Sequence, residues 1–257
     1  SQYGFTATAI SLTTAIGGAM SLPTPLFIGW LSDHIGRKRL LLLCLAAGCL
    51  VGLANGILIT AVGIPPLIAT LGTMGLVKGL TLTILPYPGG YVPSQFTRII
   101  LTNVGGAVPL GFVYLVASTL LLALFLRNGR AGRRIYAVGG NEVKAQIAGI
   151  NVNLVKIQTY LLSSVLATLG GLAIAARIRS GDPLVGDPLT LNSIAAVLVG
   201  GTTFVGGRGG VVGTIAGVGI LSVLRVMLNM LNVSPFYQDI LSGLIVVIAV
   251  LYSSLKR

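Results

Sequence analysis

The chain has 257 residues, of which 54% are hydrophobic and only 9% are charged, and its mean hydropathy is +0.95. A soluble domain of this size needs far more charge to cover its surface, so the composition indicates an all-α polytopic membrane protein. The formal net charge of +12 does not indicate nucleic-acid binding, because the bases stand in short clusters between apolar segments, as expected of bases retained in the cytoplasm.

Apolar segments that match or approach the thickness of a hydrocarbon core recur along the chain. We expect about eight membrane segments: residues 5–31, 40–60, 64–86, 108–126, 153–177, 191–204, 211–231 and 236–254. The sixth is short and runs into GGTTFVGGRGG, which predicts a broken or re-entrant element that lines a cavity. Residues 87–107 carry turn residues and predict an extramembrane loop.

Glycines at helical spacing predict helices that approach one another closely. They are Gly48, Gly52, Gly56, Gly209, Gly213 and Gly217. Asn55, Asn192 and Asn229 are amides inside apolar segments, where hydrogen bonding to a neighbouring helix is the ordinary role. We favour Asn192 for solute contact because it adjoins the predicted broken element.

The orientation of the spans follows from residues 127–146, which hold five bases and therefore predict a cytoplasmic loop. Alternating outward from this loop places residues 87–107 outside and the end of the chain inside. The same count places Arg37, Lys38 and Arg39 outside, against the tendency of bases to stay inside. The first part of the chain thus disagrees with the rest about topology.

A short helix is predicted at the end of that cytoplasmic loop. Asn141 is a good N-cap, Glu142 follows at the positive end of the helix, and Gly149 suits a left-handed ending. We expect about two helical turns and then a long helix capped by Asn151 or Asn153. Such a helix, joined stiffly to a span, is suited to transmit force from a cytoplasmic partner, although a simple polar connector has the same pattern.

Three long motifs follow one another in the second half of the chain: GRRIYAVGGNEVKAQIAGINVNLVKIQTYLLSSVLATLGGLAIAARI, GDPLVGDPLTLNSIAAVLVGGTTFVGGRGGVVGTIAGVGIL and NMLNVSPFYQDILSGLIVVIAVL. Together with GLANGILITAVGIPPLIATLGTM they resemble the membrane permease of ribose-type ABC sugar importers, from about residue 45 to the end. Many members of that family carry a Tyr-Glu-Leu-Asp run where this chain has Leu189, Thr190, Leu191 and Asn192. The two missing carboxylates leave the identity of the sugar open.

The stretch GWLSDHIGRKR, which begins at Gly29, resembles instead the cytoplasmic loop motif between the second and third helices of major facilitator transporters. We therefore expect two parts: residues 1–45, a facilitator-like segment interpreted as a foreign join, and residues 46–257, an ABC permease domain truncated at its N-terminus. The resemblance to the permease implies the ABC importer permease fold for the second part.

What the permease resemblance implies about assembly is a second permease copy, identical or related, and a periplasmic or lipid-anchored sugar-binding protein. It also implies a cytoplasmic ATP-binding subunit, which carries ATP and Mg while this chain binds no cofactor. The site of ATPase coupling is expected at Asn141, Glu142, Ala145 and Gly149, of which Glu142, Ala145 and Gly149 match a Glu-Ala-Ala-like core in looser form. The implied location is the inner membrane of a prokaryote, in contact with membrane lipid.

Two further groups of candidate residues lie at and after the short sixth segment. The expected translocation path includes Thr190, Asn192, Thr202 and Thr203. The expected backbone-packing glycines are Gly200, Gly201, Gly206, Gly207 and Gly209.

The alternatives are a secondary transporter of the facilitator type and a truncated or chimeric permease without function. A secondary transporter is disfavoured because few ionisable residues lie inside the membrane; Lys78 and Arg225 either snorkel or face a cavity. An enzyme is disfavoured because His34 and five scattered acids form no catalytic pair or metal cluster, and Cys44 and Cys49 have no metal or redox spacing. The chain has no phosphate-binding Gly-x-x-x-x-Gly-Lys-Ser/Thr run of its own.

Overall fold

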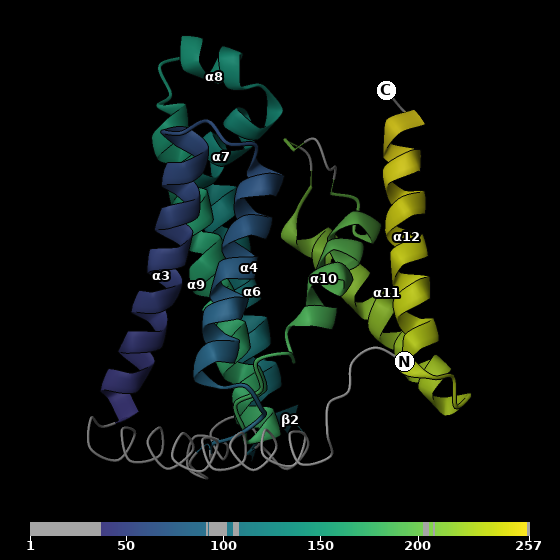
Figure 1. Cartoon of the computed structure of the whole chain (residues 1–257). Helices are drawn as coiled ribbons and strands as arrows, with labels where there is room; N and C mark the ends of the chain where they lie inside the picture. The colour runs from purple at the N-terminus through teal and green to yellow at the C-terminus, as the bar shows by residue number, and fades with distance from the viewer. Residues whose placement is uncertain are drawn as a thin grey trace, which may run out of the picture. The chain divides into compact units, whose positions relative to one another are not determined.

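The computed structural model describes residues 37–90, 92, 102–104, 108–202, 206, 207 and 209–255 (Figure 1). The predicted segment at residues 5–31, together with Asp33 and His34, lies outside the described residues. In chain order the elements are α3 (Arg37–Thr60), α4 (Pro66–Ile84), β1 (Asn103–Val104), β2 (Val108–Pro109), α6 (Leu110–Asn128), α7 (Arg130–Gly140), α8 (Glu142–Ile147), α9 (Val152–Ile178), α10 (Asp187–Val199), α11 (Val211–Met230) and α12 (Pro235–Leu255).

Five of the described helices are long and apolar enough to cross a membrane: α3 from Leu41, α4, α6, α9 and α11. They confirm a mostly helical, multi-pass membrane protein, while the predicted total of about eight segments stays a prediction. The sixth predicted segment appears as α10, which starts at Asp187 and ends at Val199, earlier than the expected residues 191–204. With 13 residues, α10 spans about 20 Å at 1.5 Å per residue, which is short of a full crossing.

The predicted cytoplasmic loop contains a helix that the sequence interpretation missed. α7 places Arg130, Arg133 and Arg134 on exposed positions, while Val138 is buried. This two-sided pattern is that of an amphipathic helix at the edge of a membrane. Two glycines in its last turn and the dense charge at its start weakened the helical signal.

One compact unit comprises residues 1–111 and 160–183. In it α3 packs on α4, and Asn55 Oδ1 accepts a hydrogen bond of 2.8 Å from Thr73 Oγ1. Gly48 faces Thr168 of α9, so the predicted close approach at this α3 glycine is confirmed. Around the expected outer loop, Gly89 and Gly181 exchange two backbone hydrogen bonds of 2.9 Å, and β1 pairs antiparallel with β2.

The second unit comprises residues 112–159 and 184–257. α10 packs on both α11 and α12, and its Ala195 and Ala196 form a buried cluster with Leu221. Small side chains at such contacts let helix backbones approach closely, as in other membrane bundles. Between α11 and α12, Gln238 Nε2 donates to Asn229 Oδ1 over 2.8 Å, which confirms the ordinary helix-bonding role for that amide.

Candidate functional site

The predicted short helix after the basic stretch is confirmed as α8. Asn141 adopts an extended backbone, and its Oδ1 accepts a hydrogen bond of 2.9 Å from Lys144 N, which satisfies a free amide of the first turn. At the other end Gly149 has φ +80°, and Ile150 N donates to Ala145 O over 3.0 Å. This left-handed glycine with a bond back across the last turn is a Schellman-type ending, as the sequence predicted.

α9 begins almost immediately after α8. Of the two predicted caps the structure uses Asn151, whose Oδ1 accepts a hydrogen bond of 3.1 Å from Leu154 N. Asn153 lies inside α9 with its side chain exposed, so it does not cap the helix. Only residues 148–151 separate α8 from a helix that continues unbroken for 27 residues. The connection between the two helices is therefore short and fixed at both ends.

The inner face of α8 is locked to its neighbours. Ala145 is 4% exposed and packs in a buried cluster with Val138 of α7 and Val155 of α9. Across the turn, Lys156 Nζ lies 2.7 Å from Glu142 Oε2, an ion pair that the sequence interpretation did not include. The predicted site residue Ala145 thus faces inward and anchors the helix, and it offers no surface to a partner.

The outer face of α8 carries two large apolar side chains that sequence reasoning overlooked. Val143 is 67% exposed and Ile147 is 82% exposed. They stand four residues apart and so lie on one side of the helix. The signal was present in the pattern Glu-Val-Lys-Ala-Gln-Ile, whose apolar residues at spacing four flank a buried alanine.

The predicted path residues lie on α10 and in the turn that follows it. Thr190 and Asn192 are half-buried on α10, Thr202 N donates to Val197 O over 3.2 Å, and Thr203 lies outside the described residues. Asn192 Nδ2 donates to Pro188 O one turn back, while its Oδ1 is buried without a hydrogen-bond partner. Asn192 therefore differs from Asn55 and Asn229, which bond to neighbouring helices.

The glycines around this turn divide by what surrounds them. A Cβ added to Gly200 would collide with the backbone of Gly213. A Cβ added to Gly207 would lie 2.6 Å from the Cα of Gly140. Gly201 has open space around it, so its φ of +83°, and not packing, explains the glycine. Gly209 precedes α11 with φ +144° and faces Thr202, so it lies outside the predicted helix stripe.

Some of these contacts link α7 to the turn after α10. The end of α7 meets the turn after α10 through Gly139 with Gly206 and through Gly140 with Gly207. Tyr136 Oη, also on α7, donates a hydrogen bond of 3.1 Å to Gly209 O. The helix that precedes the expected coupling segment is thus in direct contact with the expected packing glycines of the turn after α10, within one compact unit, a link that spacing in the sequence did not predict.

Within the described ranges no group of three or more His, Cys, Asp and Glu side chains is placed to hold a metal ion. Cys44 and Cys49 are both free thiols on α3.

The long apolar helices define a multi-pass membrane protein. The family model described as "Branched-chain amino acid transport system / permease component" matches residues 2–250, and the chain belongs to this family. The match includes residues 1–45 almost entirely, and the predicted division at residue 45 stays a prediction.

Curated relatives make the class more specific. The chain is 36% identical over 248 residues to the ribose import permease protein RbsC of Bacillus subtilis (strain 168), covering 94% of this chain and 76% of that protein. It is 38% identical to RbsC of Escherichia coli (strain K12), covering 83% of this chain and 68% of that protein. The galactose/methyl galactoside import permease protein MglC of Escherichia coli (strain K12) is 36% identical to this chain, and the match covers 84% of this chain and 66% of that protein. The predicted resemblance to sugar import permeases is confirmed, and no solved structure gives a significant match.

Proposed function

We propose that the chain is the membrane permease subunit of an ATP-driven importer for a monosaccharide such as ribose, galactose or a related sugar. Its relatives carry the names of ribose and galactose import permeases. The observation that carries the proposal is the construction of α8, whose inner face is locked to α7 and α9 while Val143 and Ile147 project outward. A helix built in this way is suited to receive a partner and to pass its movement on.

The partner that hydrolyses ATP docks on α8 from the cytoplasm. Exposed Val143 and Ile147 form an apolar pair that insertion into a groove would bury. Full burial of such side chains contributes about 1.5–3 kcal/mol each. ATP and Mg are held by that partner, and this chain carries no cofactor.

Movement of α8 can pass to the rest of the protein by two routes, here called its outlets. The first is α9, which follows after residues 148–151 and is tied back by the pair Lys156–Glu142. The second is the turn after α10, which α7 contacts through Tyr136 and its terminal glycines. ATP binding and hydrolysis in the partner would displace both outlets together and open the path alternately to the two sides of the membrane.

The sugar path runs past α10 and the turn that follows it, along Thr190, Asn192, Thr202 and Thr203. The buried, unpartnered Oδ1 of Asn192 is the strongest support, because a buried acceptor without a bond is unfavourable by about 1–3 kcal/mol until it finds a donor. Sugar hydroxyls are such donors. A second permease copy, a sugar-binding protein outside the membrane and a location in the inner membrane of a prokaryote complete the proposal.

The test is to purify the tagged chain in mild detergent from its native host, identify the proteins that accompany it, and measure ATP-driven uptake of labelled ribose and galactose in vesicles. Recovery of an ATP-binding subunit together with ATP-dependent sugar uptake supports the proposal. A folded chain recovered alone, or uptake that follows an ion gradient and ignores ATP, would contradict it.

A further inference from the structure

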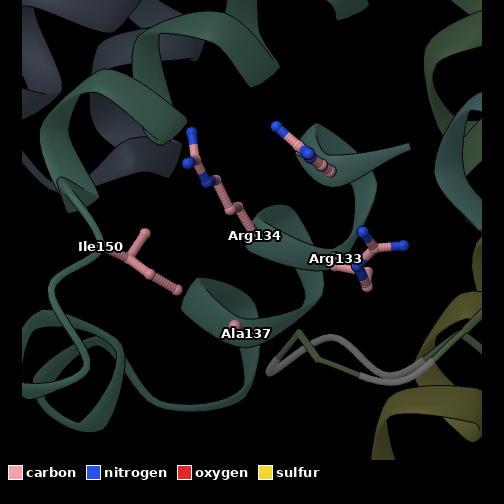
Figure 2. A pocket seen from close by; sticks show the side chains of 5 residues that line it. Arg133, Arg134, Ala137 and Ile150 are labelled. Carbon is pink, nitrogen blue, oxygen red and sulfur yellow. The ribbon is translucent and has the colours of Figure 1, made fainter. Parts of the chain in front are cut away.

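Three arginines surround a shallow hollow at the start of the basic segment. The hollow has a volume of about 420 Å³ and is lined by Arg130, Arg133, Arg134, Ala137 and Ile150. Figure 2 shows the Ile150 side chain directed toward the ribbon of α7 near Ala137, with the Arg134 side chain directed away from Ala137. Three of the five lining residues are thus arginines, here called the basic rim, and the other two are apolar.

The guanidinium groups of this rim carry uncompensated charge. None of the three forms an ion pair within the described part of the chain, and their one hydrogen bond to protein is that of Arg133 Nη1 to Asn128 O, at 3.1 Å. The nearest acid along the chain, Glu142, is already paired with Lys156. Arg130 and Arg134 thus keep their full sets of donors for a ligand, and a planar guanidinium binds two oxygens of a phosphate or carboxylate at once.

The position of the three arginines along the chain indicates how deep in the membrane they lie. Arg130 starts α7 two residues after Asn128 ends the apolar helix α6, and Arg133 bonds to the Asn128 carbonyl itself. Residues this close to the end of a span lie in the polar headgroup layer, which is about 5–7 Å thick on each side of the hydrocarbon core. Anionic groups available at this depth are the phosphates of membrane lipids.

We propose that this hollow binds the phosphate of an anionic phospholipid in the cytoplasmic leaflet. Arg130 and Arg134 bind the phosphate oxygens, Arg133 adds charge while it caps the end of α6, and Ala137 and Ile150 contact the glycerol and the first carbons of the acyl chains. A protein partner fits this place less well, because the exposed apolar pair suited to docking, Val143 and Ile147, lies on the separate helix α8. The lipid would hold α7 at the membrane surface.

The experiment measures lipid retention by the purified full chain in detergent, using native mass spectrometry with added phosphatidylglycerol or phosphatidylcholine. The variant is the double substitution Arg130→Gln/Arg134→Gln, which leaves the structural bond of Arg133 intact. Its matched control is Arg127→Gln/Lys144→Gln, which removes the same charge from exposed bases of the same segment that do not line the hollow. A parallel arm replaces the lipid by inorganic phosphate, and another measures binding of the ATP-binding subunit.

We expect the unaltered chain to retain phosphatidylglycerol in preference to phosphatidylcholine. The double variant should lose about 20-fold in affinity, because two guanidinium groups that bind the phosphate oxygens are removed, whereas the control should lose threefold or less. Equal loss in variant and control would overturn the site and leave a general charge effect. Equal binding of inorganic phosphate would overturn the lipid assignment, and unchanged lipid binding with loss of the ATP-binding subunit would assign the rim to a protein partner instead.

Discussion

At the α7–α8–α9 junction side chains hold the three helices together, whereas the turn after α10 meets α7 mainly through the backbones of glycines. The junction has caps at Asn141 and Asn151, an ion pair at Glu142 and an apolar cluster around Ala145. The turn after α10 instead relies on close approach of glycine backbones, and on α10 itself the buried Oδ1 of Asn192 has no hydrogen-bond partner. Caps and side-chain contacts therefore fix the first region, whereas the packing of the second depends on glycines that have no side chain.

The largest effect should come from filling the backbone contact of the second region. Gly207→Ala combines a left-handed φ of +73° with a Cβ only 2.6 Å from the Cα of Gly140. The strain and the forced displacement together should lower stability by about 2–5 kcal/mol. Gly201→Ala is the matched control, since its φ of +83° gives the strain without the collision, and it should cost about 1–2 kcal/mol.

Thermal unfolding in detergent, followed by size-exclusion chromatography, compares the two glycine variants. If Gly207→Ala and Gly201→Ala lose the same stability, the contact between α7 and the turn after α10 contributes nothing, and the proposed second outlet fails.

A second prediction concerns the unpartnered amide. Asn192→Ala should raise the KM for sugar uptake about three- to tenfold with little change in stability, because it removes one hydrogen bond made to sugar. Asn229→Ala should lower the yield of folded protein and leave the KM nearly unchanged, since it removes the shorter of the two hydrogen bonds of the buried Gln238 Nε2, whose other acceptor is Val233 O. Uptake kinetics of both variants check this, and a KM unchanged in Asn192→Ala would remove Asn192 from the path.

The N-cap of α9 should contribute less to stability than the glycine contact at Gly207. Asn151→Ala should lower stability by about 1 kcal/mol, because Leu154 N loses its acceptor, and should weaken the coupling of ATP hydrolysis to transport. Asn153→Ala, at an exposed position two residues later, should leave both nearly unchanged. Unfolding midpoints and the ratio of sugar carried to ATP hydrolysed measure the difference. Equal effects of the two substitutions would show that the cap at Asn151 does not stabilise α9.

The smallest effect is expected at the ion pair. Glu142→Gln and Lys156→Gln should each lower stability by about 0.2–1 kcal/mol, since the carboxylate side chain is 55% exposed and solvent screens the pair. The double variant should lose no more than either single variant, because the interaction is shared. A double-mutant cycle on unfolding midpoints tests this, and additive losses would mean that the two groups act independently.

The two regions also differ in how far the sequence predicts them. Caps and turns depend on local residue types, so Asn141, Gly149 and the direct start of α9 could be predicted. The contact of Gly139 and Gly140 with Gly206 and Gly207 could not be predicted. A glycine indicates that its backbone needs room or conformational freedom, but it does not indicate which segment packs against it. The outward direction of Val143 and Ile147 required the buried position of Ala145, which packing with α7 and α9 decides.

The most direct test of the proposed coupling is the affinity of the ATP-binding subunit for the purified chain in detergent, compared between Ile147→Ser and Gln146→Ser. Ile147 is 82% exposed on the outer face of α8, and Gln146 is an exposed neighbour on the same helix. Loss of a buried isoleucine at the interface should weaken binding by about tenfold or more, while Gln146→Ser should change it less than threefold. Full binding by Ile147→Ser would contradict docking through α8.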